Sequence, residues 1–206
     1  QFKVGDAVVA FTDVKMGCYA EYTCIAEDAA VIHKPTNLSF IEATALSFGG
    51  TTALHFLKKT KLQSGEKVLI NGASGGVGTA MVQLAKQLGA EVTGVCSTTN
   101  VDLLKSIGAD VVIDYTQQDF TQQHKTYDVI IDTTGKRAYA DCKAALKDRG
   151  RLALASASVP QMLKALWGAM TSKHKVIIGP AFGRAEALQF LADLAQQGKY
   201  CPVIDR

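Results

Sequence analysis

Residues 68–78 read Val68-Leu69-Ile70-Asn71-Gly72-Ala73-Ser74-Gly75-Gly76-Val77-Gly78. An apolar run ends in a glycine cluster, and apolar residues with helical spacing follow at once. This order is typical of a strand, a tight turn and a helix N-terminus. Glycines let backbone amides approach phosphate oxygens, and the helix adds unpaired N–H groups and the positive end of its dipole. The stretch predicts a turn that holds the pyrophosphate of a dinucleotide, and the alternative is an ordinary strand–helix corner.

The dinucleotide pattern G-x-G-x-x-G falls on Ala73, Gly75 and Gly78, so an alanine replaces its first glycine. Strands and helices then alternate along the chain, which is typical of a parallel sheet covered on both faces. We therefore expect an α/β fold with a doubly wound, six-stranded parallel Rossmann sheet. After the first strand, the expected strands cover residues 91–96, 111–115, 127–132, 150–155 and 175–178. The expected helices cover residues 101–107, 137–146, 161–170 and 184–197.

Residues 1–40 have a different pattern from the rest. Short strands are expected within 2–11, 18–25 and 30–35, too few and too short for a stable sheet of their own. They are interpreted as the end of an all-β catalytic domain, followed by a nucleotide-binding domain over residues 41–206. Ser39 and Glu42 have the spacing of a capping box, which starts a helix or a broken pair of helices reaching about Lys59. Both ends of the chain are expected to be cuts in a longer protein.

The composition excludes several classes of function. Hydrophobic residues make up 48% of the 206 residues, and the net charge of +3 comes without a basic stripe, so no nucleic-acid partner is expected. No apolar run approaches the roughly 18 residues of a membrane span, so no membrane partner is expected either. The five cysteines lack a C-x-x-C pair and are expected to be buried, reduced thiols of a cytoplasmic protein.

The chain resembles the medium-chain dehydrogenase/reductase superfamily on its zinc-independent quinone oxidoreductase side, which includes zeta-crystallin-like proteins and plant alkenal/one oxidoreductases. The resemblance covers nearly the whole chain and is carried by residues 2–6, 17–22, 42–53, 71–89, 103–110, 112–115 and 198–206. It implies a partial GroES-like β domain beside the Rossmann domain, a homodimer, and hydride transfer from NADPH to a quinone or an α,β-unsaturated carbonyl. The alternatives are an alcohol dehydrogenase of the same superfamily and a nucleotide-binding member without turnover.

NADPH is favoured over NADH by the end of the second strand. An NAD-specific site has an acidic residue there, whereas this chain has Ser97 and Thr98, which can donate to a 2′-phosphate. The alternative role for this pair is to cap the next helix. The resemblance adds Thr52 beside the nicotinamide and Tyr115 beside the phosphate. The predicted cofactor-binding residues are Thr52, Ala73, Ser74, Gly75, Gly76, Val77, Ser97, Thr98, Tyr115, Thr133 and Ser156.

No metal ligand and no catalytic side chain are predicted. By the resemblance, Phe48 occupies the position of the third zinc ligand in alcohol dehydrogenases, and a phenyl ring has no donor atom for zinc. Cys18 and Cys24 are expected to be core residues, not ligands. The four histidines are scattered along the chain and are interpreted as surface or core residues. The group that stabilises the developing oxyanion is expected to lie outside this sequence.

Overall fold

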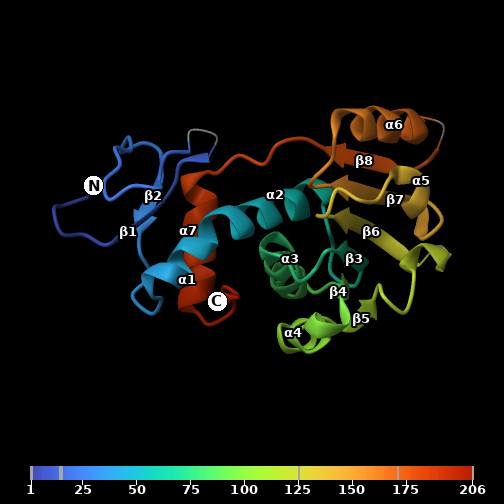
Figure 1. The fold of residues 1–206 in the computed structure, drawn as a ribbon, viewed down its shortest axis with the longest axis horizontal. Coiled ribbons are helices and arrows are strands. Elements are labelled where there is room, and N and C mark those ends of the chain that lie inside the picture. The colour runs from blue at the N-terminus through green and yellow to red at the C-terminus, as the bar shows by residue number, and fades with distance from the viewer. Residues whose placement is uncertain (1, 14–15, 125, 171, 206) are drawn as a thin grey trace.

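The computed structural model describes residues 2–13, 16–124, 126–170 and 172–205, and it contains two sheets (Figure 1). The larger sheet has six parallel strands in the order β5-β4-β3-β6-β7-β8. This order is that of a dinucleotide-binding Rossmann sheet, with its reversal beside β3. The predicted fold class is confirmed. The strands are β3 (Lys67–Asn71), β4 (Glu91–Cys96), β5 (Val111–Asp114), β6 (Tyr127–Asp132), β7 (Leu146–Leu154) and β8 (Lys175–Ile178).

Both faces of this sheet are buried, so its strands are apolar almost without interruption. Successive side chains point to opposite faces. Val68 and Ile70 pack into one buried cluster with α2, α3 and α7, while Leu69 packs into a second cluster with α5 and α6. These helices are α2 (Thr51–Thr60), α3 (Gly76–Gln87), α5 (Tyr139–Cys142), α6 (Val159–Met170) and α7 (Ala185–Gln196). The shorter helices α4 (Val101–Ser106), η3 (Thr98–Asn100) and η4 (Phe120–Gln122) lie in connections between strands.

The predicted broken helix is present and runs into the nucleotide-binding part. Helix α1 (Phe40–Ala45) begins at Ser39, whose hydroxyl accepts from the Glu42 amide, and the Glu42 carboxylate accepts from the Ser39 amide. This is the expected capping box. A π-helical turn, η2 (Leu46–Gly50), joins α1 to α2.

Two expected elements differ from the structure. The helix expected over 137–146 is only α5, and β7 already starts at Leu146, because the Ala145 carbonyl accepts the amides of Thr126 and Tyr127 and so joins the sheet. The strand expected over 18–25 is absent, since the small antiparallel sheet consists of β1 (Val8–Phe11) and β2 (Ala30–His33) and places no described strand beside this segment.

The cysteine prediction is partly wrong. Cys96 and Cys142 are buried as expected, but Cys18, Cys24 and Cys201 are exposed. Cys18 and Cys24 lie in the segment without a strand partner, so no sheet covers them.

Candidate nucleotide-binding site

The turn between β3 and α3 is held by the close approach of its own backbone. Gly72 has a φ of +80°, which favours glycine. A Cβ on Gly78 would lie 2.2 Å from the Gly72 carbonyl oxygen and 2.6 Å from the Ala73 Cα. The first turn of α3 therefore sits directly on the end of β3, and no larger residue fits at 78.

The π-helical turn η2 forms a second wall against α3. A Cβ on Gly49 would lie 2.5 Å from the Gly76 carbonyl oxygen, so the backbones of η2 and α3 nearly touch. Short π-helical segments occur frequently at functional sites. Here the segment places the ring of Phe48 at the mouth of a cavity beside the glycine turn.

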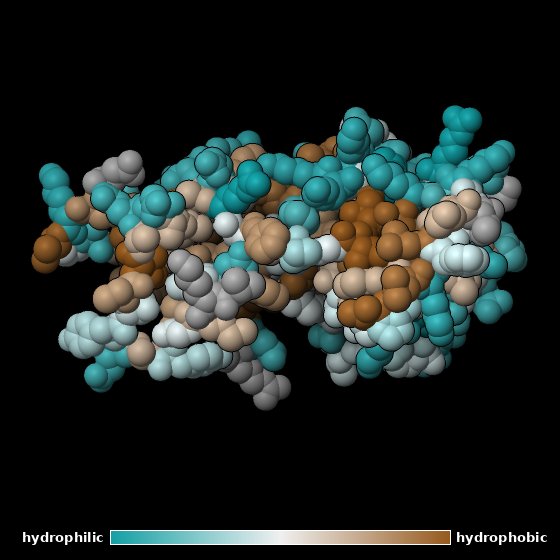
Figure 2. Space-filling model, turned by 90° about the horizontal axis from the view of Figure 1, so that it is seen from above, coloured by the Kyte–Doolittle hydropathy of each residue, from teal (hydrophilic) through white to brown (hydrophobic). Residues whose placement is uncertain are grey.

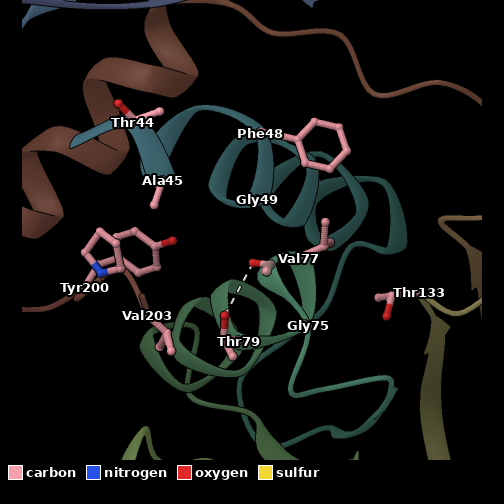
Figure 3. A pocket seen from close by; sticks show the side chains of 13 residues that line it. Thr44, Ala45, Phe48, Gly49, Gly75, Val77, Thr79, Thr133, Tyr200 and Val203 are labelled. Atoms are coloured by element: carbon pink, nitrogen blue, oxygen red, sulfur yellow. Dashed lines mark hydrogen bonds between the residues drawn. The ribbon is translucent and has the colours of Figure 1, made fainter. Parts of the chain in front are cut away.

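This cavity has a volume of about 430 Å³ (Figure 3). Figure 3 shows Tyr200 and Val203 on one side of the first turn of α3, and Phe48 and Thr133 on the other. The lining residues are Thr44, Ala45, Phe48, Gly49, Gly75, Gly76, Val77, Gly78, Thr79, Thr133, Tyr200, Pro202 and Val203.

The first amides of α3 are open to an anion. Gly75 occupies the N-cap position and provides no side-chain cap, so the first N–H groups of the helix have no side-chain acceptor. The helix has 12 residues, and its dipole places partial positive charge at this end. Together these features suit a phosphate group.

Residues at the end of β6 hold the far side of the turn. The Thr133 hydroxyl lies 2.9 Å from the Asn71 carbonyl oxygen and 3.2 Å from that of Gly72. The buried Asp132 carboxylate accepts from the Asn71 side chain at 2.7 Å and from the Gly135 amide at 3.1 Å. Asp132 thus fixes the ends of two neighbouring strands. This aspartate was not among the predicted site residues, although it closes a predicted strand.

A second polar group lies where β4 and β5 end. The Thr98 hydroxyl donates to Asp114 at 2.6 Å, and Asp114 also accepts the amide of Thr116 at 2.9 Å. These bonds hold the pKa of the Asp114 carboxyl below its usual value, and the bond from Thr98 contributes most. Ser97 is at the N-cap of η3 but makes no capping bond. Its hydroxyl accepts from the Asn100 side chain at 3.1 Å.

The predicted cofactor residues fall into three places. The cavity brings together Gly75, Gly76, Val77 and Thr133, while Ser97, Thr98 and Tyr115 lie at the ends of β4 and β5. Ser156 follows β7 and lies beside Gly135, where an added Cβ would be 3.1 Å from its hydroxyl.

The other three predicted residues also lie outside the cavity lining. Ala73 is fully buried, and its amide donates to the Val95 carbonyl at 3.0 Å, so that amide is already used within the sheet. Ser74 is a half-buried residue of the turn itself, and Thr52 is buried in α2.

Most of the cavity wall outside the glycine turn was not predicted from the sequence. The pair Gly49-Gly50 was a detectable signal, because adjacent glycines in a helical pattern indicate close backbone approach. Tyr200 and Val203 had no such signal, since they reach α3 from a segment more than a hundred residues later. Burial raises the pKa of Tyr200, which keeps its hydroxyl protonated. Among the described residues, no three His, Cys, Asp or Glu side chains form a group that could hold a metal ion.

The zinc-binding dehydrogenase family matches residues 76–197 of the chain. Among curated relatives, a 2-methylene-furan-3-one reductase of Solanum lycopersicum is 36% identical over 193 residues, covering 93% of this chain and 46% of its own length. A chloroplastic quinone oxidoreductase of Triphysaria versicolor is 33% identical and is matched over 99% of this chain and 65% of itself. A chloroplastic NADPH-dependent alkenal/one oxidoreductase of Arabidopsis thaliana is 31% identical, with coverages of 98% and 51%.

Solved structures agree with these relatives. The quinone oxidoreductase from Coxiella burnetii superposes with a TM-score of 0.86 at 30% identity, covering 96% of this chain and 62% of that structure. The chain therefore spans about half to two thirds of the length of the proteins it matches.

Proposed function

The chain belongs to the zinc-binding dehydrogenase family, within the medium-chain dehydrogenases and reductases, and on that premise we propose that the protein transfers hydride from NADPH to a quinone or an α,β-unsaturated carbonyl. The observation that carries this proposal is the open helix N-terminus of α3 behind a glycine turn, at the reversal of the strand order. The names of the quinone and alkenal/one relatives support the acceptor class.

The proposal assigns different tasks to the three places along the sheet edge. Gly76 and Val77 hold the pyrophosphate with their amides, and Gly75, whose own amide donates to the Gly72 carbonyl at 3.2 Å, closes the turn beside it. Ser97, Thr98 and Tyr115 bind the 2′-phosphate of the adenosine ribose. When bound, NADPH supplies the hydride, and the protein orients it and keeps water away.

Thr52, Thr133 and Ser156 are proposed to lie on the nicotinamide side of the cofactor. Their positions support this, since Thr133 directly follows β6 and Ser156 comes two residues after the carboxyl end of β7. Ala73 and Ser74 are proposed to act by shaping the turn.

Two units are proposed in the chain, a part of a GroES-like β domain over residues 1–40 and a Rossmann domain over 41–206. The separate sheet β1-β2 and the start of α1 at Phe40 support this division. Helix α7 also packs on β2, so the two units share an interface.

We propose that the reaction uses no resident zinc, because the Phe48 side chain offers no donor at the position that the family resemblance assigns to a ligand. Elemental analysis of the purified protein tests this. Zinc in a one-to-one ratio would contradict it.

A homodimer is also proposed. Helix α6 exposes a row of large apolar side chains, and the brown surface over α6 in Figure 2 shows them gathered on one face. A patch of this kind marks an interaction site more often than a free surface. The exposed residues are Val159, Leu163, Leu166, Trp167 and Met170. Light scattering of wild type and of Leu166→Lys tests this: the variant is expected to be monomeric.

No helix among the described residues is long and apolar enough to cross a membrane. A cytoplasmic location stays a prediction from the cysteine pattern, and the chloroplastic names of two relatives make the plastid the competing compartment. Cell fractionation distinguishes them.

Steady-state oxidation of NADPH tests the main proposal. The acceptors are a quinone, an enal, a saturated aldehyde and a buffer blank. Turnover with the first two supports the proposal. Turnover with the aldehyde alone would indicate the alcohol dehydrogenase alternative, and NADPH binding without any turnover would indicate a nucleotide-binding protein.

A further inference from the structure

A second cavity, of about 570 Å³, lies beside α2, under the segment that joins β8 to α7. Its apolar walls come from α2 and from that segment, which includes Pro180 and Phe182. Its polar and charged lining residues are Thr51, His55, Lys58, Lys59 and Arg184.

The cavity is cationic. Lys58, Lys59 and Arg184 line it, no carboxylate does, and no ion pair with these three is found among the described residues. The nearby acidic residues Asp13 and Glu186 lie outside the lining. Asp13 accepts the Gly183 amide at 3.2 Å.

The pKa of His55 reflects the positive charge around this cavity. It is half-buried on α2, and burial lowers its pKa, with Lys59 and Arg184 adding to the effect. The imidazole is therefore neutral at neutral pH, and the two cations lie close enough to disfavour its charged form.

The position of the cavity separates it from the two proposed phosphate positions of the cofactor. It adjoins Ile178 and Gly179 at the carboxyl end of β8, the edge strand of the sheet. The glycine turn follows β3, three strands away, and Ser97 follows β4, four strands away. At about 4.8 Å per strand these separations are roughly 14 and 19 Å.

We propose that this cavity binds an anionic group, a phosphate or a carboxylate, carried by the acceptor substrate. It lies at the same sheet edge as Thr133 and Ser156, toward the end where the nicotinamide is proposed to lie. Apolar walls accommodate a carbon skeleton, and three cations neutralise the charged end. The assignment of this anion to the substrate rests on the proposed reductase function, whereas the binding of an anion rests on the cavity alone.

Binding is tested first without any turnover. Inorganic pyrophosphate is titrated into the protein, and the imidazole C–H resonance of His55 is followed by NMR, with His124 as the reference. The bound anion offsets the positive charge of Lys59 and Arg184, so the pKa of His55 is expected to rise, while the His124 resonance is expected not to move. In K59Q/R184Q the apparent affinity is expected to fall about tenfold or more, and in the control K105Q/K143Q it is expected to stay unchanged.

The substrate is tested by comparing two acceptors, an enone that carries a terminal carboxylate and its methyl ester. Wild type is expected to favour the carboxylate in kcat/KM by about tenfold, and K59Q/R184Q to lose that preference while reducing the ester as before. If pyrophosphate leaves the pKa of His55 unchanged, or if K59Q/R184Q and K105Q/K143Q lose affinity equally, the anion site would be overturned.

If the pKa of His55 rises but both acceptors are reduced with equal kcat/KM, the anion site does not belong to the acceptor substrate. A responsive His55 with neither acceptor reduced would refute the reductase function and leave the anion site standing. The two failures are thus distinguishable.

Discussion

The turns that follow β3 and β4 end neighbouring parallel strands, yet they are held in different ways. The first, Gly72–Gly78, is held by backbone atoms, with Gly78 packed on the Gly72 carbonyl oxygen and Gly49 on that of Gly76. The second, at Ser97 and Thr98, is held by side-chain hydrogen bonds, including the one to Asp114. The first turn therefore tolerates no added atom at its backbone contacts, whereas the second can exchange side chains and change what it binds.

The largest effect is expected from Gly78→Ala. Its Cβ would meet backbone atoms of Gly72 and Ala73, which cannot move without shifting β3 or α3. We expect the free energy of unfolding to fall by about 3 kcal/mol, and NADPH binding to be lost. Urea denaturation and calorimetry measure the two.

The matched control is Gly76→Ala, where an added Cβ has no atom within 4 Å. Its stability is expected to stay within about 0.5 kcal/mol of wild type. Equal destabilisation by both substitutions would show that the turn is not held by backbone contact.

A smaller loss is expected from Gly49→Ala, which presses η2 against the Gly76 carbonyl oxygen at 2.5 Å. Because this overlap is less severe than the 2.2 Å approach at Gly78, we expect a loss of about 2 kcal/mol in the free energy of unfolding. Cofactor affinity is expected to weaken without being lost. A variant as stable as wild type would mean that the second wall of the cavity is adjustable.

The turn after β4 is expected to change specificity instead of stability. Ser97→Asp places a carboxylate where the 2′-phosphate is proposed to bind, and should shift preference from NADPH toward NADH by about 1 to 2 kcal/mol. Unfolding should be almost unaffected. Calorimetric titration with both cofactors measures the shift.

Asp114→Asn changes the charge of the same turn in the opposite direction and serves as the control for Ser97→Asp. It removes a negative charge beside Thr98 and should favour NADPH further. If the two variants shift the preference in the same direction, the 2′-phosphate does not bind at this turn.

The smallest effect is expected from lowering the pH through the pKa of Asp114. Hydrogen bonds lower the pKa of Asp114 below its usual 3.8, so the stabilisation they give is present above that value and is lost as the pH falls through the lowered one. The turn Gly72–Gly78 contains no titratable side chain. Amide NMR shifts of Thr98 and Thr116 should therefore titrate below pH 3.8 while those of Gly75 and Gly76 stay constant. A common midpoint for all four would instead indicate unfolding of the whole sheet.

Elements whose pattern repeats along the chain were predictable. The bounds of β4, β6 and β8 match their apolar runs, and the Ser39–Glu42 capping box forms as its spacing predicts. Residues 18–25 alternate as a strand does, but strand formation needs a neighbouring strand, which no local pattern reports. The helix expected over 137–146 failed for a related reason, because the Ala145 carbonyl pairs with Thr126 and Tyr127.

The sequence by itself determined the glycine turn, the alternation of strands and helices and the hydroxyl pair at residues 97–98, because each depends on residues close together in the chain. Only the tertiary structure decided that Asp114 lies beside Thr98, that Gly49 lies against Gly76, and that Tyr200 closes the cavity. Those contacts depend on strand order and helix packing. Both are set by burial of the whole core, and no short stretch of sequence encodes them.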